Sequence, residues 1–278
     1  MTHETVPLYG GHLSRRVTIR DLRAAKERGE RWPMLTSYDM YSAEVFDEAG
    51  IPVLLVGDSA GNNVYGYPDT VPVTLEDLIP LARAVVRSTH RALIVCDLPF
   101  GSYQVSSEQA LTTSIRVMKE TGAQAVKLEG GLTVVDSVRR IVEAGIPVMA
   151  HTGFTPQSVN AIGGYRVQGR GDDADRLIES ALALEEAGAF AIVLEMVTAE
   201  VAAEVTKRLS IPTVGIGAGP DCDAQVLVWQ DMAGMRAGRM PRLVKQYGDL
   251  RGALATATRA FAEDVVSGAF PAEEHTYH

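Results

Sequence analysis

The chain has 278 residues, of which 46% are hydrophobic and 22% are charged, and its formal net charge at pH 7 is -9. This composition is typical of a globular chain long enough for one large core. The negative charge argues against nucleic acid as the main partner. Uncharged stretches are too short to span a membrane, and residues 1–16 lack the apolar segment of a signal peptide. Because there are only two cysteines, Cys96 and Cys222, we expect no disulfide framework and a cytoplasmic location.

The first residues differ from the rest of the chain in pattern. Residues 1–16 combine turn formers and charges without a clear period, so we predict a loose N-terminal tail there. Thr18 to Arg28 has helical spacing, with Thr18 as N-cap and Asp21 in the first turn. We expect residues 17–278 to form one catalytic domain.

A short phrase then recurs along the chain. Glu48 to Val53 reads EAGIPV, and Glu143 to Val148 repeats it letter for letter. Glycine suits the left-handed position after a helix, and proline is tolerated as the first residue of a strand. The phrase therefore indicates repeated helix-to-strand junctions rather than separate domains.

Apolar runs and helical patterns alternate between these junctions. The predicted strands are Met34–Ser37, Val53–Val56, Ala92–Cys96, Ala125–Leu128, Val148–Ala150, Ala191–Leu194, Thr213–Ile216 and Gln225–Val228. The predicted helices between them are Ala43–Ala49, Leu75–Ser88, Ser107–Glu120, Val134–Ala144, Asp175–Ala187 and Glu200–Leu209. This order predicts an α/β fold, a single (β/α)8 TIM barrel with an N-terminal helix and a C-terminal helical extension over Arg251–Val266. A doubly wound open sheet is the alternative.

Five successive predicted strands end in ionisable side chains, and barrel enzymes place their chemistry at these ends. The residues are Asp58, Asp97, the pair Lys127 and Glu129, His151, and Glu195. One such residue often caps the next helix, but capping alone does not explain five strands converging on one end of the barrel. The pattern predicts an active site there.

Asp58, Asp97 and Glu129 come from three adjacent strands and offer hard oxygen ligands. Crowded carboxylates repel one another unless a cation is present, and these ligands favour Mg²⁺. Zinc fits less well, because only one histidine and no well-placed cysteine are nearby. The alternative is that one or two of these carboxylates only cap helices or bind neighbours, with Glu129 the first candidate for an indirect role.

The remaining residues suggest chemistry on an α-keto acid. A metal beside Lys127 suits a substrate whose oxygens develop negative charge, such as an enolate. Glu195 is the candidate base, although a salt bridge to a neighbouring cation is the alternative. His151 either orients the substrate or shuttles a proton, or it is a hydrogen-bonding spacer; the sequence leaves both open.

Three loops contain many glycines or turn formers. Residues 163–171 carry two arginines and are a candidate lid over an anionic ligand, and Tyr65 to Val73 is a second candidate. Gly215 to Gly219 lacks the spacing of a dinucleotide-binding fingerprint and is interpreted as a tight turn.

Several blocks of sequence, in this order, carry a family resemblance. They are Val56-Gly57-Asp58-Ser59, Asp97-Leu98-Pro99-Phe100, Val126 to Gly131 (VKLEGG), His151 to Asn160 (HTGFTPQSVN), Gly163 to Arg170 (GGYRVQGR), Gly215 to Gly219 (GIGAG) and the closing Glu273-Glu274-His275. From about Thr18 to the C-terminus, the chain resembles ketopantoate hydroxymethyltransferases.

The resemblance implies a cytoplasmic, Mg²⁺-dependent barrel enzyme of pantothenate synthesis. It would move a hydroxymethyl group from the co-substrate 5,10-methylenetetrahydrofolate to 3-methyl-2-oxobutanoate, giving 2-dehydropantoate through a Mg²⁺-stabilised enolate. By position, Asp58, Asp97 and Glu129 match metal-site carboxylates. Asp58, Ser59, Asp97 and Lys127 match the keto-acid site, and Glu195 matches the proton acceptor. The family also implies a homo-oligomer, a decamer.

Two other functions are compatible with parts of this pattern. A lyase or mutase of the phosphoenolpyruvate mutase and isocitrate lyase kind shares the barrel, the metal and the α-keto acid enolate. Such enzymes carry a reactive cysteine on a lid loop, and neither Cys96 nor Cys222 has that context. A barrel without activity, kept as a scaffold, is the other alternative, which the intact set of ionisable strand ends disfavours.

Overall fold

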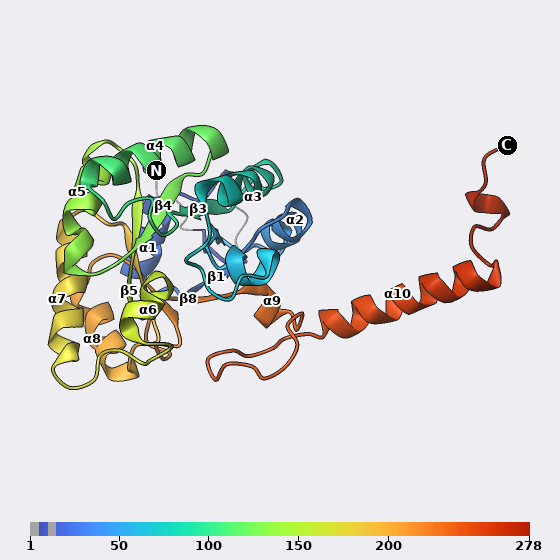
Figure 1. The fold of residues 1–278 in the computed structure, drawn as a ribbon. Coiled ribbons are helices and arrows are strands. Elements are labelled where there is room, and N and C mark those ends of the chain that lie inside the picture. Colours follow the sequence, from blue (N-terminus) through green and yellow to red (C-terminus); the bar gives the residue numbers. More distant parts are fainter. Residues whose placement is uncertain (1–5, 11–14) are drawn as a thin grey trace. The chain divides into compact units, whose positions relative to one another are not determined.

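The computed structural model describes residues 6–10 and 15–278, and strands in these residues form one closed parallel barrel (Figure 1). In chain order they are β1 (Trp32–Thr36), β2 (Val53–Val56), β3 (Leu93–Asp97), β4 (Ala125–Glu129), β5 (Val148–Gly153), β6 (Ala191–Glu195), β7 (Thr213–Ile216) and β8 (Ala224–Leu227). Each strand pairs with its neighbours in sequence, and β8 closes on β1. The predicted (β/α)8 barrel is therefore confirmed, and the open-sheet alternative is wrong.

In the described residues up to 228, the helices that follow the first strand lie between strands in the sequence and mostly on the outside of the barrel, and one more helix precedes the first strand (Figure 1). They are α1 (Ile19–Glu27), α2 (Met40–Glu48), α3 (Leu75–Arg87), α4 (Ser107–Thr121), α5 (Val135–Glu143), α6 (Val159–Ile162), α7 (Asp173–Glu186) and α8 (Ala199–Arg208). The predicted helices are confirmed, with ends that differ by a few residues. The short α6 was not predicted, because four residues are too few for a helical period.

The repeated phrase marks the junctions that were expected from it. Gly50 follows α2 with φ 85°, and Gly145 follows α5 with φ 87°, which are left-handed values that suit glycine. Pro52 and Pro147 each come directly before a strand. Each phrase therefore turns the chain from an outer helix back into the barrel.

The strands are buried on both faces, as expected where helices cover a parallel sheet. Every residue of β2, β3 and β4 is buried. The register pairs Asp97 with Lys127 and Glu129 with His151 on neighbouring strands. The ionisable residues therefore reach the same level at the carboxyl ends of the strands.

Part of the predicted N-terminal tail packs against the barrel. Residues 1–5 and 11–14 lie outside the described residues. Leu8 is only 1% exposed and belongs to the hydrophobic core. Its N–H donates to Glu30 Oε1 at 2.5 Å, and its carbonyl accepts from the guanidinium of Arg91. A single buried leucine in a polar segment has no period, so its sequence pattern did not predict this contact.

The two candidate lid loops contain structure of their own. Tyr65 ends a π-helix, η1 (Gly61–Tyr65), and its hydroxyl donates to the carbonyl of Asp77 at 2.7 Å. In the other loop, Gln168 forms a bridge with Val197, and its N–H donates to the carbonyl of Met196 at 2.8 Å. Closure of either loop over a ligand stays a prediction.

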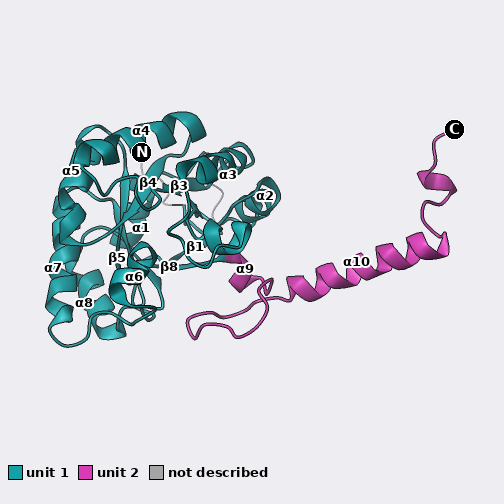
Figure 2. Cartoon of the chain, in the orientation of Figure 1, with its two compact units in different colours: residues 1–228 teal, residues 229–278 magenta. Residues whose placement is uncertain are grey.

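The described chain divides into two compact units, residues 1–228 and residues 229–278 (Figure 2). The second unit contains α9 (Trp229–Met232), α10 (Leu250–Ser267) and η4 (Glu273–His275). Helix α10 confirms the predicted C-terminal helix. That residues 17–278 act as one catalytic domain stays a prediction. No helix in the described residues has the length and hydrophobicity that membrane crossing requires.

Candidate active site

Contacts between side chains connect four neighbouring strands at the carboxyl end of the barrel. Lys127 Nζ lies 3.0 Å from Asp97 Oδ1 and 3.2 Å from His151 Nδ1. His151 Nε2 in turn lies 3.4 Å from Glu195 Oε2. Residues from β3, β4, β5 and β6 thus form one continuous row.

Lys127 and Asp97 form a buried ion pair, with side chains 5% and 3% exposed. Burial alone would lower the pKa of Lys127, but the nearby carboxylates of Asp97, Glu129 and Asp58 outweigh it and raise the pKa above its ordinary value. Lys127 is therefore a permanent cation in this site. A buried charged residue with a perturbed pKa beside a specific partner is a candidate for a functional site.

Asp58 lies in the turn after β2 and is 3% exposed. Its N–H donates to Asp97 Oδ2 at 2.9 Å, which fixes the two aspartates relative to each other. Burial, followed by repulsion from Glu129 and Asp97, raises the pKa of Asp58 well above its ordinary value. The site therefore holds more negative charge than Lys127 alone neutralises.

Glu129 and His151 pair across β4 and β5. Glu129 Oε1 lies 3.5 Å from His151 Nδ1, and Glu129 Oε2 accepts the N–H of Gln157 at 3.0 Å. Burial and the Lys127 cation lower the pKa of His151, but the nearby carboxylates of Glu129 and Glu195 outweigh them and raise it to about 9. The imidazole therefore links the two glutamates.

Glu195 is the most exposed carboxylate of the row, with 17% of its side chain accessible against 3% for Asp97 and Glu129. Its carbonyl accepts the N–H of Phe154 at 2.8 Å. The next residue, Met196, has φ 48°, in the left-handed region that a residue with a side chain rarely adopts. A constrained turn therefore directs a carboxylate that remains accessible to a small molecule.

Ser59 is half-buried beside this row, and its hydroxyl lies 2.8 Å from the hydroxyl of Tyr38. The structure thus places Ser59, Asp58, Asp97, Lys127, Glu129, His151 and Glu195 together. Tyr38, Tyr103 and Gln157 also contact these residues, although the sequence pattern did not predict a role for them. For Gln157, its place in a polar block just after a strand was a usable signal; the two tyrosines offered none.

The carboxylate oxygens of Asp58, Asp97 and Glu129 are of the type that binds hard divalent cations. The described side chains alone, however, do not surround a metal position. Among the residues that the structure describes, no group of three or more His, Cys, Asp and Glu side chains has an arrangement that would hold a metal ion. Both oxygens of Glu129 already have partners. Asp58 and Asp97 supply neighbouring buried carboxylate oxygens, which are the ligands that hard divalent cations prefer. A cation there would oppose the effects of burial and of repulsion from Glu129 and Asp97, which together raise the pKa of Asp58.

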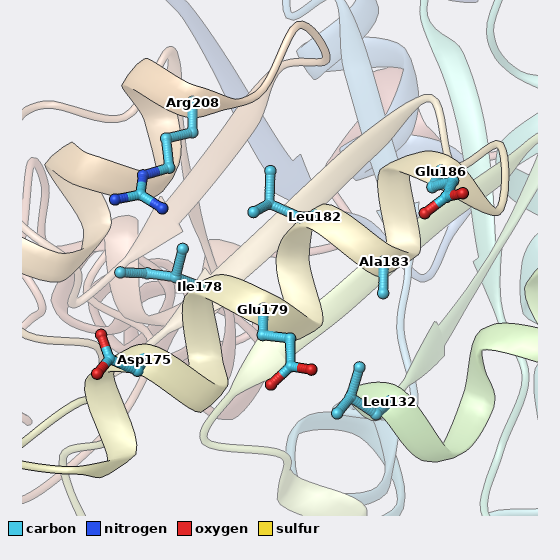
Figure 3. A pocket seen from close by; sticks show the side chains of 8 residues that line it. All are labelled: Leu132, Asp175, Ile178, Glu179, Leu182, Ala183, Glu186 and Arg208. Atoms are coloured by element: carbon cyan, nitrogen blue, oxygen red, sulfur yellow. The ribbon is translucent and has the colours of Figure 1, made fainter.

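One surface groove lies apart from these residues. Its volume is about 460 Å³, and Figure 3 shows its lining along α7, with one residue from α8 and one from η2 (Leu132–Val134). The lining residues are Leu132, Asp175, Ile178, Glu179, Leu182, Ala183, Glu186 and Arg208. None of the predicted site residues lines it.

A closed parallel barrel with converging charged side chains at the carboxyl ends of its strands defines a (β/α)8-barrel enzyme. Solved structures agree on the fold. Phosphonopyruvate hydrolase in complex with oxalate and Mg²⁺ matches with a TM-score of 0.58 at 15% identity, covering 92% of each chain. A 2,3-dimethylmalate lyase of the phosphoenolpyruvate mutase and isocitrate lyase superfamily matches with a TM-score of 0.57 at 17% identity, covering 93% of this chain and 91% of the lyase.

Sequence comparison is far more specific. The family model of ketopantoate hydroxymethyltransferase matches residues 16–273. The 3-methyl-2-oxobutanoate hydroxymethyltransferase of Saccharopolyspora erythraea is 64% identical, over 98% of this chain and 93% of the relative. The enzyme of the same name from Thermobifida fusca is 62% identical over 99% of both chains. The chain belongs to the ketopantoate hydroxymethyltransferase family, as its motifs predicted.

The lyase or mutase alternative is less well supported. The structures of that superfamily share the fold at low identity, which is evidence for the fold alone. Cys96 is buried in β3, and Cys222 is buried between β7 and β8. Neither thiol lies on an exposed lid loop. The scaffold alternative is also disfavoured, because the chain retains a connected set of buried charges and belongs to a family of enzymes.

Proposed function

We propose that the chain transfers a one-carbon unit from 5,10-methylenetetrahydrofolate to 3-methyl-2-oxobutanoate, forming 2-dehydropantoate for pantothenate synthesis. The family and the names of the relatives support the substrates. The observation that carries the proposal is the row of contacts from Asp97 through Lys127 and His151 to Glu195. It places a buried cation and an accessible carboxylate at the same end of the barrel.

We propose Mg²⁺ as the metal, held by Asp58 and Asp97. Carboxylate oxygens are the ligands that Mg²⁺ prefers, and it usually binds through one or two of them, with water and substrate oxygens as the others. When bound, Mg²⁺ would act as a Lewis acid toward the oxygens of the keto acid. Glu129, whose oxygens face His151 and Gln157, would not bind the metal directly but would hold these two neighbouring residues in place.

The keto acid would bind against Lys127 and Ser59. The Lys127 ammonium offers a fixed positive charge to oxygens that become more negative during the reaction. The Ser59 hydroxyl, oriented by Tyr38, offers a hydrogen bond at the edge of the same site. Because Lys127 is already paired with Asp97, its position is set before the substrate arrives.

Glu195 would remove the proton from C3 of the keto acid. His151 holds its carboxylate from one side and is itself held by Glu129. Water would cleave the two C–N bonds of the folate's methylene bridge, releasing tetrahydrofolate and a one-carbon unit at the oxidation level of formaldehyde. The electron pair left on the substrate would form the new C–C bond to that carbon, and the carbonyl oxygen, which comes from the water, would take up a proton to become the hydroxyl of the hydroxymethyl group.

Proton NMR of 3-methyl-2-oxobutanoate in D2O, with the protein but without folate, tests this function. We expect the C3 proton signal to disappear only when protein and Mg²⁺ are both present. Adding methylenetetrahydrofolate should then produce 2-dehydropantoate. Absence of product with both substrates and Mg²⁺ would refute the proposal, whereas product without prior exchange would mean that folate must bind before the base acts.

The expected homo-oligomer, a decamer by family resemblance, and the cytoplasmic location stay predictions. Light scattering coupled to gel filtration measures the molar mass directly. A mass near that of a single 278-residue chain would contradict the oligomer prediction.

A further inference from the structure

Gln157 occupies a central place among the carboxylates, although the proposed reaction assigns it no role. It lies in η3 (Pro156–Ser158), directly after β5, and is 4% exposed. Its Nε2 donates to Asp58 Oδ2 at 2.8 Å and to the carbonyl of Leu98 at 3.0 Å. Both amide protons are therefore used, and one of them holds a carboxylate of the proposed metal site.

The orientation of this amide is determined by its other end. Gln157 Oε1 accepts from the hydroxyl of Tyr103 at 2.6 Å and from Gln104 Nε2 at 3.2 Å. Turning the amide around would place Oε1 against the Asp58 carboxylate and the Leu98 carbonyl, where two acceptors would meet. Only one orientation therefore satisfies every partner.

The hydroxyl of Tyr103 is itself fixed, because it accepts the N–H of Glu129 at 3.1 Å. The backbone of Gln157 adds a second link, since its N–H donates to Glu129 Oε2 at 3.0 Å. Gln157 thus donates hydrogen bonds to two carboxylates, that of Asp58, which follows β2, and that of Glu129, which ends β4. A buried network in which every member has a partner is rigid and has one arrangement.

We infer that Gln157 is a positioning residue for the divalent cation, acting through Asp58. The inference rests on the proposed function, in which Asp58 and Asp97 hold the metal. A neutral amide orients the Asp58 carboxylate without adding a positive charge, so it leaves the negative charge for the cation. Asp97 already pairs with the Lys127 cation, whereas Asp58 Oδ2 accepts from the neutral Gln157 amide.

Gln157→Met tests the inference, because methionine has similar length and no amide. Affinity for Mn²⁺ alone, measured from the electron paramagnetic resonance signal of free Mn²⁺ without substrate, is the readout. Loss of a partner that orients a ligand weakens metal binding by about 10- to 100-fold, and we expect a loss of that size. Tyr103→Phe, which removes the hydroxyl behind Gln157, should give a smaller loss in the same direction.

Gln124→Met is the matched control. Gln124 lies just before β4, at the opposite end of the strand, and its amide also makes two hydrogen bonds, to Ile94 N and to Gly122 O. It should lower the unfolding temperature without changing Mn²⁺ affinity. A purely structural role for Gln157 would make the two glutamine variants behave alike.

Unchanged Mn²⁺ affinity in folded Gln157→Met would overturn the inference and leave the proposed function intact. If that variant does not fold, unchanged affinity in Tyr103→Phe would overturn it instead. If the unaltered protein binds no Mn²⁺, the metal site fails together with the inference, and this outcome is seen before any variant is made.

Discussion

Lys127 Nζ lies 3.0 Å from Asp97 Oδ1, and less than a tenth of either side chain is exposed. The pair joins β3 and β4 at residues that the sheet register places side by side. Asp58 and Glu129 add further negative charge around the same ammonium. The single Lys127 ammonium therefore faces three carboxyl groups, and a bound divalent cation would add positive charge beside them.

Lys127→Met tests whether Lys127 and Mg²⁺ compensate the charge of the same carboxylates. Removing one partner of a buried ion pair costs about 3–5 kcal/mol, because the other charge is left uncompensated. In the proposed function Mg²⁺ would bind only the folded chain, so it should recover part of this loss and raise the unfolding temperature more in the variant than in the unaltered protein. Calorimetry with and without Mg²⁺ measures both effects. Equal Mg²⁺ effects in the two proteins would argue against shared electrostatics.

Glu195→Gln should stop proton removal while leaving substrate binding largely intact. Glutamine keeps the size of the side chain but cannot accept the proton, and a positioned base contributes about 10²- to 10⁴-fold to a rate. C3 exchange in D2O measures the rate, and titration calorimetry measures keto-acid binding. Glu200→Gln, on the exposed first turn of α8, is the control. Rapid exchange in Glu195→Gln would exclude Glu195 as the base.

Met196→Gly should separate stability from activity. A residue with a side chain in the left-handed region costs about 1–2 kcal/mol, and glycine avoids this cost but gains freedom in the unfolded chain. We expect unchanged or slightly higher stability with a lower kcat, because the backbone beside Glu195 is less constrained. Met196→Ala removes the side chain but keeps the constraint, so it should retain more activity. A full rate in Met196→Gly would show that the constraint is unnecessary.

Both thiols should be unreactive in the folded protein. Burial raises the pKa of Cys96 and of Cys222, and the thiolate is the reactive form. A colorimetric disulfide reagent should detect neither thiol until guanidinium unfolds the chain, and iodoacetamide should leave activity unchanged. Rapid inactivation by one equivalent of alkylating agent would instead favour the lyase or mutase alternative.

Asp21 should contribute stability that depends on pH. Hydrogen bonds from the Arg15 guanidinium at 2.7 and 2.8 Å outweigh the effect of burial and lower the pKa of Asp21 from 3.8 to about 2. Because the folded-state pKa is lowered, the stabilisation is complete above about pH 4 and is lost as pH falls toward 2. The pair is partly exposed, so solvent screening limits its contribution to less than about 1 kcal/mol. Urea unfolding of Arg15→Gln should differ from the unaltered chain at pH 7, and the difference should shrink below pH 4; a constant difference would contradict the assignment.

The strand and helix pattern could be predicted because it depends on local sequence. Each strand of this barrel contains a short, mainly apolar stretch, and the phrase EAGIPV marks two of the junctions by residues with particular backbone requirements. Some features of unit 1 have no such local pattern. The π-helix η1 and the short α6 have no period, and the docking of Leu8 depends on a distant surface.

The sequence alone predicted which ionisable residues would gather at one end of the barrel, because every parallel strand of a barrel ends at the same side. Only the tertiary structure decided which of them touch. It paired Lys127 with Asp97, placed His151 between two glutamates, and brought Gln157 and Tyr103 from separate loops to the carboxylates. Such contacts depend on sheet register and loop conformation, which arise from packing across the whole barrel rather than from neighbouring residues in the chain.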